Sequence, residues 1–327
     1  MREGVIVVLS YPDTVVRPAY SEFSSKIWPF FGVGGNDAVQ AGHASLLLID
    51  KQIGIVDYFD FGRYITTFGF GRVRSKASDP ELVVPIKATF ENNQLMNLEE
   101  LLLWLDKHPE KTHGEGRLVA SVNDAIDYNK ASAYIHQLIS EKEIPYGAFV
   151  KKGTNCARFV TDTILNSCLD KKVKRKLTVS NLFTPSPIGN TIKGTTENYI
   201  FKVENQQISE YTNRSIIQEY SKCFFKKIDK KPNRIGTEFP DTKSFELSNG
   251  TWLGGIGSGA WFGIVSEING VYQIARYSSK GEKDFEGSFK VKSTSFEVDK
   301  ACSFVYPTNC KEVFIEQNGT QFLFVKV

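Results

Sequence analysis

The chain has little cysteine, histidine and methionine. Its 327 residues include five cysteines, four histidines and two methionines. An odd, sparse set of cysteines without a CxxC pair argues against a disulfide framework and against a structural zinc site. We therefore expect neither a metal nor another cofactor.

A strong charge of either sign is also lacking. The 40 basic and 37 acidic residues leave a net charge of +3. This balance gives no reason to expect nucleic acid or an anionic membrane as a partner. The sequence does not predict an oligomeric state.

Long apolar runs are absent as well. No stretch approaches the roughly 20 apolar residues that a membrane-spanning helix needs. The run Val5 to Leu9 is too short for the core of a signal peptide and is typical of a buried strand. We expect a chain without a membrane span, cytoplasmic as it stands, and exported if a leader has been removed from it.

The composition is that of a globular protein, with 41% hydrophobic and 24% charged residues. At about 100–200 residues per domain, the length suggests two domains. Residues Ser180 to Thr196 are rich in Ser, Thr, Pro and Gly, so we place a boundary here and predict domains at 1–185 and 186–327. Short alternating strands and the hairpin signal Asn269-Gly270 predict that the second domain is smaller and β-rich.

Strands and helices alternate in the first domain. His43 to Ile49 and Ile53 to Tyr64 are expected to form a hairpin around Asp50-Lys51-Gln52. Asn123 to Lys142 and Asn155 to Leu169 have the apolar periodicity of helices. The fold class we predict is α+β, with an antiparallel sheet packed against helices.

Cys156 occupies a position where its chemistry would matter. A loop that contains Gly153 leads into the predicted helix, and Cys156 falls in its first turn. The N–H groups and the dipole at a helix start stabilise an anion, which favours the thiolate over the thiol. Cys168 lies near the end of the same helix beside Leu165 and Leu169, and should be inert packing.

The sequence around Cys156 resembles the NlpC/P60 cysteine peptidases. That family has a Pro-Tyr and Gly-rich stretch about ten residues before a helix start of the type Asp-Cys-Ser-Gly-Phe-Val. Here Tyr146, in Pro-Tyr-Gly, stands ten residues before Cys156, in Asn-Cys-Ala-Arg-Phe-Val. Asn155 replaces the usual Asp, and Ala157-Arg158 replace Ser-Gly.

The order of the residues resembles a permuted branch of this family. No His follows His136, whereas His43 begins a predicted strand far upstream of the Cys. This order is similar to that of the lecithin–retinol acyltransferase-like and YiiX-like proteins. The resemblance covers about residues 5–170 and implies a papain-like core, with Cys156 as nucleophile and His43 as its base.

The chemistry also needs a third group that orients the imidazole. If the turn is centred on Lys51-Gln52, Asp60 lies opposite His43. A shifted register would favour Tyr58 and a bulge would favour Asp57, so the three stay open, with Asp60 ranked above Asp57. By resemblance, Tyr146 lines the substrate site or assists the oxyanion hole.

The expected substrate contacts are Tyr146, Tyr58, Asn155 and Arg158. The leading hypothesis is a thiol hydrolase that cleaves an amide bond in a cell-wall (murein) peptide, so the expected partner is a peptide or muropeptide. The substrate class comes from family analogy. Two alternatives remain: a lipid-directed acyltransferase or esterase of the same fold, and an inactive hydrolase-like domain used as a binding module.

Overall fold

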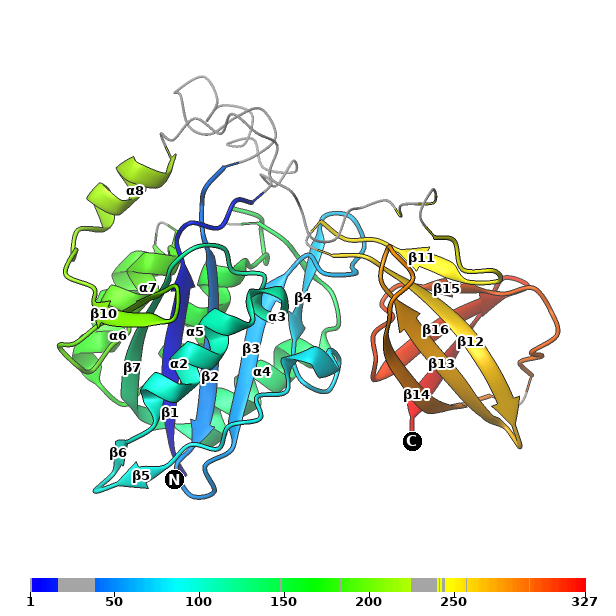
Figure 1. The fold of residues 1–327 in the computed structure, drawn as a ribbon, viewed down its shortest axis with the longest axis horizontal. Coiled ribbons are helices and arrows are strands. Elements are labelled where there is room, and N and C mark those ends of the chain that lie inside the picture. The colour runs from blue at the N-terminus through cyan, green and yellow to red at the C-terminus, as the bar shows by residue number, and fades with distance from the viewer. Residues whose placement is uncertain are drawn as a thin grey trace.

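The computed structural model describes most of the chain. The described residues are 2–16, 39–147, 149–182, 184–224, 240, 242, 245–256, 258–293 and 295–327. They form two large antiparallel sheets with separate cores and one two-stranded sheet, and among the described residues helices pack only on the first large sheet (Figure 1). The predicted α+β class is confirmed.

The first sheet has eight strands in the order β10-β9-β7-β1-β2-β3-β4-β8. Its strands are β1 (Glu3–Tyr11), β2 (His43–Asp50), β3 (Val56–Gly62), β4 (Phe70–Arg74), β7 (Leu118–Asp127), β8 (Ile144–Pro145), β9 (Phe201–Glu204) and β10 (Gln207–Glu210). The short strands β5 (Phe90–Glu91) and β6 (Gln94–Leu95) pair only with each other among the described residues.

Helices cover both faces of this sheet (Figure 1). On one face lie α4 (Tyr128–Ser140), α5 (Cys156–Ser167) and α6 (Lys171–Asn181), and on the other lies α2 (Leu98–Lys107). Strand β1 runs through the centre and sends alternate side chains into the two cores. This explains why its sequence is continuously apolar instead of alternating.

The second sheet has seven strands in the order β11-β12-β13-β14-β17-β16-β15. They are β11 (Thr251–Leu253), β12 (Ala260–Ile268), β13 (Val271–Tyr277), β14 (Lys283–Val291), β15 (Ser303–Val305), β16 (Glu312–Gln317) and β17 (Thr320–Lys326). The two edge strands meet where the Phe304 N–H donates to Thr251 Oγ1 at 3.0 Å, so the sheet curls nearly into a barrel. The predicted β-rich second domain is confirmed.

The Asn269-Gly270 hairpin forms as predicted, between β12 and β13. Both turn residues have positive φ, 53° and 74°, which is the backbone that a two-residue hairpin turn requires. Asn and Gly adopt this conformation most readily. The Asn-Gly pair was therefore sufficient to predict this hairpin from the sequence.

The first sheet and its helices form one unit, and the C-terminal sheet forms a second. The domain boundary predicted after residue 185 falls inside the first unit. The helix α7 (Pro187–Lys193) packs on β1, and β9 and β10 extend the first sheet to Glu210. The Ser- and Pro-rich composition reflects a helix start: Ser186 accepts a hydrogen bond from the Gly189 N–H at 3.0 Å, and Pro187 is the first helical residue. The chain reaches the second sheet only after α8 (Ile216–Phe224).

The two units touch through charged groups. Arg276 of β13 is 6% exposed and bonds to Glu81 Oε2 at 2.9 Å and to Asp284 Oδ1 at 2.8 Å. Glu81 lies in the short helix η2 (Pro80–Leu82) of the first unit. The same carboxylate cluster includes Asp79, which Arg72 of β4 binds through two hydrogen bonds of 2.6 Å.

Candidate active site

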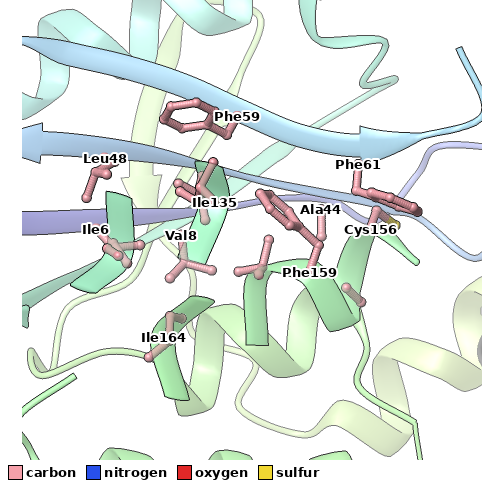
Figure 2. Close-up of a cluster of buried hydrophobic side chains, with 14 of the residues drawn as sticks. Ile6, Val8, Ala44, Leu48, Phe59, Phe61, Ile135, Cys156, Phe159 and Ile164 are labelled. Atoms are coloured by element: carbon pink, nitrogen blue, oxygen red, sulfur yellow. The ribbon is translucent and has the colours of Figure 1, made fainter. Parts of the chain in front are cut away.

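Cys156 is the first residue of α5. Asn155 precedes it in an extended conformation, and its side chain accepts a hydrogen bond from the Arg158 N–H at 2.8 Å. This N-cap fixes where the helix begins and therefore places Cys156 in the first turn. The residue is 9% exposed and lies beside Phe61 at one end of the first core (Figure 2).

His43 is the first residue of β2 and lies at the end of the sheet nearest to Cys156. Its Nε2 is 3.3 Å from Asp60 Oδ2, and it also hydrogen-bonds with Cys156. Burial by itself lowers the pKa of His43, but the hydrogen bonds to Asp60 and Cys156 outweigh it and raise the pKa to about 9. The imidazole thus joins the thiol on one side to a carboxylate on the other.

Asp60 reaches His43 in a register that differs from the predicted one. Asp60 lies directly opposite Ser45, two residues along β2 from His43. The turn is longer than expected and runs from Lys51 to Gly54, where the Gly54 N–H donates to the Asp50 carbonyl at 2.8 Å. An even shift keeps every side chain on its face of the sheet, so Asp60 and His43 still meet diagonally.

The Asp60 carboxylate is fully buried and has two further donors. Arg74 donates to it through Nε at 2.9 Å and through Nη2 at 2.5 Å, and the Tyr58 hydroxyl donates to Oδ2 at 3.1 Å. Burial raises the pKa of Asp60, but the charge of Arg74 and the hydrogen bond to His43 hold the pKa well below its usual range. Asp60 is therefore an anion that faces the imidazole.

Asp57 and Tyr58 occupy different places from Asp60. Asp57 lies opposite Leu48 on the other face of the sheet and pairs with Lys76 at 2.6 Å. Tyr58 is 2% exposed and sits beneath the Asp60 carboxylate. Of the three alternatives for the orienting group, the structure brings only Asp60 against His43 among the described residues.

One cavity of about 710 Å³ opens over Cys156 and His43. Tyr146 lines it as expected, with its ring stacked on Phe61 at 6.0 Å and the Arg63 guanidinium 4.5 Å above its centre. The described residues that line the cavity do not include the other three expected substrate contacts, which are Tyr58, Asn155 and Arg158. Substrate contact through these three stays a prediction, and the Asn155 side chain serves as the helix cap.

Sequence reasoning missed two residues of this site, Arg74 and His113. Arg74 is 1% exposed, and its guanidinium lies 3.9 Å above the centre of the Tyr64 ring. His113 stacks on Tyr64 with 4.9 Å between the ring centres. Burial and the charge of Arg74 lower the pKa of His113 to about 3, so this ring is neutral at neutral pH. The charge alternation in Phe70-Gly71-Arg72-Val73-Arg74 is unusual for a strand beside a core and singles out Arg74, but it does not indicate that Asp60 is its partner.

Within the described residues, no group of three or more His, Cys, Asp and Glu side chains is arranged to hold a metal ion. In the same part of the chain, no helix is long and apolar enough to cross a membrane.

The fold and the site geometry define an α+β protein with a papain-like core, in which a helix-start cysteine meets a histidine and a buried aspartate. The chain belongs to the Type VI secretion system effector TseH-like family, whose model matches residues 6–173. A second family model, the DUF6695 C-terminal domain, matches residues 250–327. The YiiX-like and lecithin–retinol acyltransferase-like branch stays a prediction.

Comparison with solved structures found the crystal structure of the Type VI secretion system effector TseH. It is 16% identical, with a TM-score of 0.38, and the match covers 64% of this chain and 98% of that chain. Comparison with curated proteins found no match.

Proposed function

We propose that the chain is a thiol hydrolase that cleaves an amide bond, with Cys156 as nucleophile, His43 as base and Asp60 as the group that orients the imidazole. The observation that carries the proposal is the hydrogen-bonded chain from Cys156 through His43 to Asp60, in which Cys156 and His43 line one cavity and Asp60 is buried behind them. Covalent acyl-transfer catalysis requires a nucleophile that is hydrogen-bonded to a base, which in turn is held by an orienting group.

The proposed reaction has two steps. His43 takes the proton of the Cys156 thiol, the sulfur bonds to the amide carbonyl carbon, and the C–N bond breaks while His43 returns the proton to the leaving amine. Water then attacks the thioester with His43 as base, which releases the acid and the thiol. The N–H groups of the first turn of α5 point toward the helix start, where they can stabilise the oxyanion.

The proposed substrate is a peptide of the bacterial cell wall. Membership of an effector family favours a target outside the cell that makes the protein, and hence export over a cytoplasmic location. The resemblance to NlpC/P60 peptidases supports an amide bond as the one that is cut. Tyr146, stacked in the cavity wall, is the proposed substrate contact.

Digestion of purified peptidoglycan tests this function. Wild type should release fragments with new amino and carboxyl ends, identified by mass spectrometry, and Cys156→Ala should release none while keeping the thermal unfolding midpoint within a few degrees. Cys168→Ala is the matched control, because Cys168 lies at the other end of the same helix and should keep full activity. Turnover by Cys156→Ala would contradict the proposal, and hydrolysis of acylated lipids alone would favour the lipid-directed alternative.

A further inference from the structure

The loop between β3 and β4 runs from the catalytic cavity into the second unit. Arg63 and Tyr64 of this loop line the cavity that holds Cys156. The next residue, Ile65, is 4% exposed and packs in the core of the C-terminal sheet. Its φ of 52° is unusual for a β-branched residue, so the contact with the C-terminal core has to hold this backbone in place.

Residues 254–256 and Ser258 of the C-terminal unit contact this loop. Ser258 forms a parallel β-bridge with Tyr64 (Figure 1 shows the connection between β11 and β12 reaching back to the β3–β4 loop). A Cβ at Gly255 would lie 2.4 Å from the Arg63 carbonyl oxygen and 2.5 Å from the Ile65 nitrogen, so only glycine fits this close approach. The Tyr306 hydroxyl donates to the Gly254 carbonyl at 2.6 Å and anchors the segment from the C-terminal side.

The same segment reaches the cavity itself. Ile256 lines the 710 Å³ cavity together with Cys156 and His43. Ile256 and Arg63 also line a second cavity of about 190 Å³, which Gly254, Gly255 and Tyr306 complete from the C-terminal side. The two cavities therefore share a wall at the junction of the units.

The β3–β4 loop is connected to His43 through Tyr64, Arg74 and Asp60. The Tyr64 ring lies under the Arg74 guanidinium at 3.9 Å, and Arg74 donates twice to Asp60, which bonds His43. A shift of Tyr64 would remove the support under Arg74. Such a shift would displace the His43 imidazole, and catalysis is slowed by small displacements of the reacting groups.

We propose that the C-terminal domain completes the active site: Gly255 and Ser258 position the Arg63–Tyr64 wall, and Ile256 contacts the peptide substrate. The proposal rests on the proposed function for the identity of the reaction. It gives the β-rich domain a role as part of the catalytic unit, with Gly255 as a positioning residue and Ile256 as a substrate contact.

Three variants of the full chain test the proposal: Gly255→Ala, Ile256→Ala and the control Ile268→Ala. Ile268 is 67% exposed at the far end of β12 and offers the same truncation in the same domain. The measurements are kcat and KM on a cell-wall peptide, and the rate at which iodoacetamide alkylates Cys156. Ile256→Ala should raise KM at least threefold with kcat within twofold, and Gly255→Ala should lower kcat at least tenfold and change the alkylation rate. Ile268→Ala should leave kcat, KM and the alkylation rate unchanged.

The proposal is overturned if Ile256→Ala and Gly255→Ala both match the control in KM, kcat and alkylation rate. If Gly255→Ala does not fold, as judged by circular dichroism, the KM of Ile256→Ala alone decides between the two outcomes. Alkylation separates this inference from the function it rests on. An inert Cys156 in the wild-type protein contradicts the hydrolase, whereas a reactive Cys156 together with KM, kcat and alkylation rates that match the control in both variants contradicts only the role of the C-terminal domain.

Discussion

Asp60 gathers three donors on one buried carboxylate: Arg74, Tyr58 and His43. Replacing it by Asn removes the charge and leaves the buried Arg74 without its counter-ion. We expect Asp60→Asn to lower the free energy of unfolding by about 3–5 kcal/mol and kcat by roughly three orders of magnitude. Chemical denaturation and steady-state kinetics measure the two effects.

Asp57→Asn is the matched control for this prediction. The Asp57 carboxylate pairs with Lys76, whose side chain is 48% exposed, and such a pair contributes less than about 1 kcal/mol. We expect kcat to stay within twofold. A loss of turnover in Asp57→Asn that equals the loss in Asp60→Asn would show that the wrong carboxylate has been assigned.

His43 makes stability depend on pH on the alkaline side. Its pKa in the folded protein is raised to about 9 from an ordinary value of 6.5, so the interactions of its charged form stabilise the fold fully below pH 6.5 and are lost as pH rises through 9. The shift corresponds to on the order of 3 kcal/mol. Urea unfolding at pH 6.5 and 9.5 should show this fall in wild type and not in His43→Gln. An equal fall in the free energy of unfolding between the two pH values in both proteins would contradict the raised pKa of His43.

That Cys156, His43 and Asp60 lie together could be predicted from the sequence, because each lies in a short motif or on a nearby strand. Cys156 follows a Pro-Tyr-Gly loop at a helix start, and Asp60 lies on the strand next to His43. Arg74 and His113 could not be found in this way. Arg74 reaches Asp60 through the pairing of β3 with β4. His113 itself has a left-handed backbone after a short helix and stacks on Tyr64. Neither strand pairing nor backbone handedness is written in a local pattern.

At the scale of the element, the start of α5 sets the position of the nucleophile. Asn155→Ala removes the cap that accepts the Arg158 N–H, and should cost about 1 kcal/mol of stability. It should also slow alkylation of Cys156, because the first turn frays and the thiol loses its fixed place at the helix start. Thermal unfolding and the alkylation rate are the measurements.

Asp170→Ala provides the comparison, because Asp170 caps α6 by accepting from the Lys172 and Val173 N–H groups. It should cost a similar stability and leave the Cys156 rate unchanged. If both cap variants slow alkylation equally, the effect reflects general loosening instead of the position of α5.

Element types were predictable where periodicity is local, and boundaries were not. The predicted helix from Asn123 begins instead at Tyr128, because residues 123–127 continue β7 in the centre of the sheet. Asn123 is buried there and donates to the Gly194 carbonyl at 2.7 Å. A polar residue in a central strand interrupts the apolar pattern by which a buried strand is predicted, and the hydrogen bond that accounts for it is visible only in the folded structure.

At the scale of the whole molecule, Arg276 joins the two units. Arg276→Met removes hydrogen bonds to Glu81 and Asp284, and we expect a loss of about 2 kcal/mol together with less cooperative unfolding of the two units. Calorimetry should resolve two transitions in place of one. Lys283→Met removes only the exposed pair with Glu286 and should leave the unfolding profile unchanged. A single sharp transition in Arg276→Met would contradict a structural coupling through this residue.

The two-unit architecture could be predicted from length and from the change to short strands, but the boundary could not. The segment around Pro187 has the composition of a linker, and its role as a capped helix on β1 depends on a core that is distant in sequence. The insertion of Ile65 into the second core is likewise a contact between distant segments.

The proposed function depends on the activation of Cys156 by His43. Its most direct test is the rate of iodoacetamide alkylation of each cysteine as a function of pH, with the labelled residues identified by mass spectrometry, in wild type and in His43→Gln. We predict that Cys156 reacts at least tenfold faster than Cys168, Cys302 and Cys310 at pH 7, and that His43→Gln abolishes this advantage. Faster labelling of another cysteine, or an unchanged Cys156 rate without His43, would contradict the account.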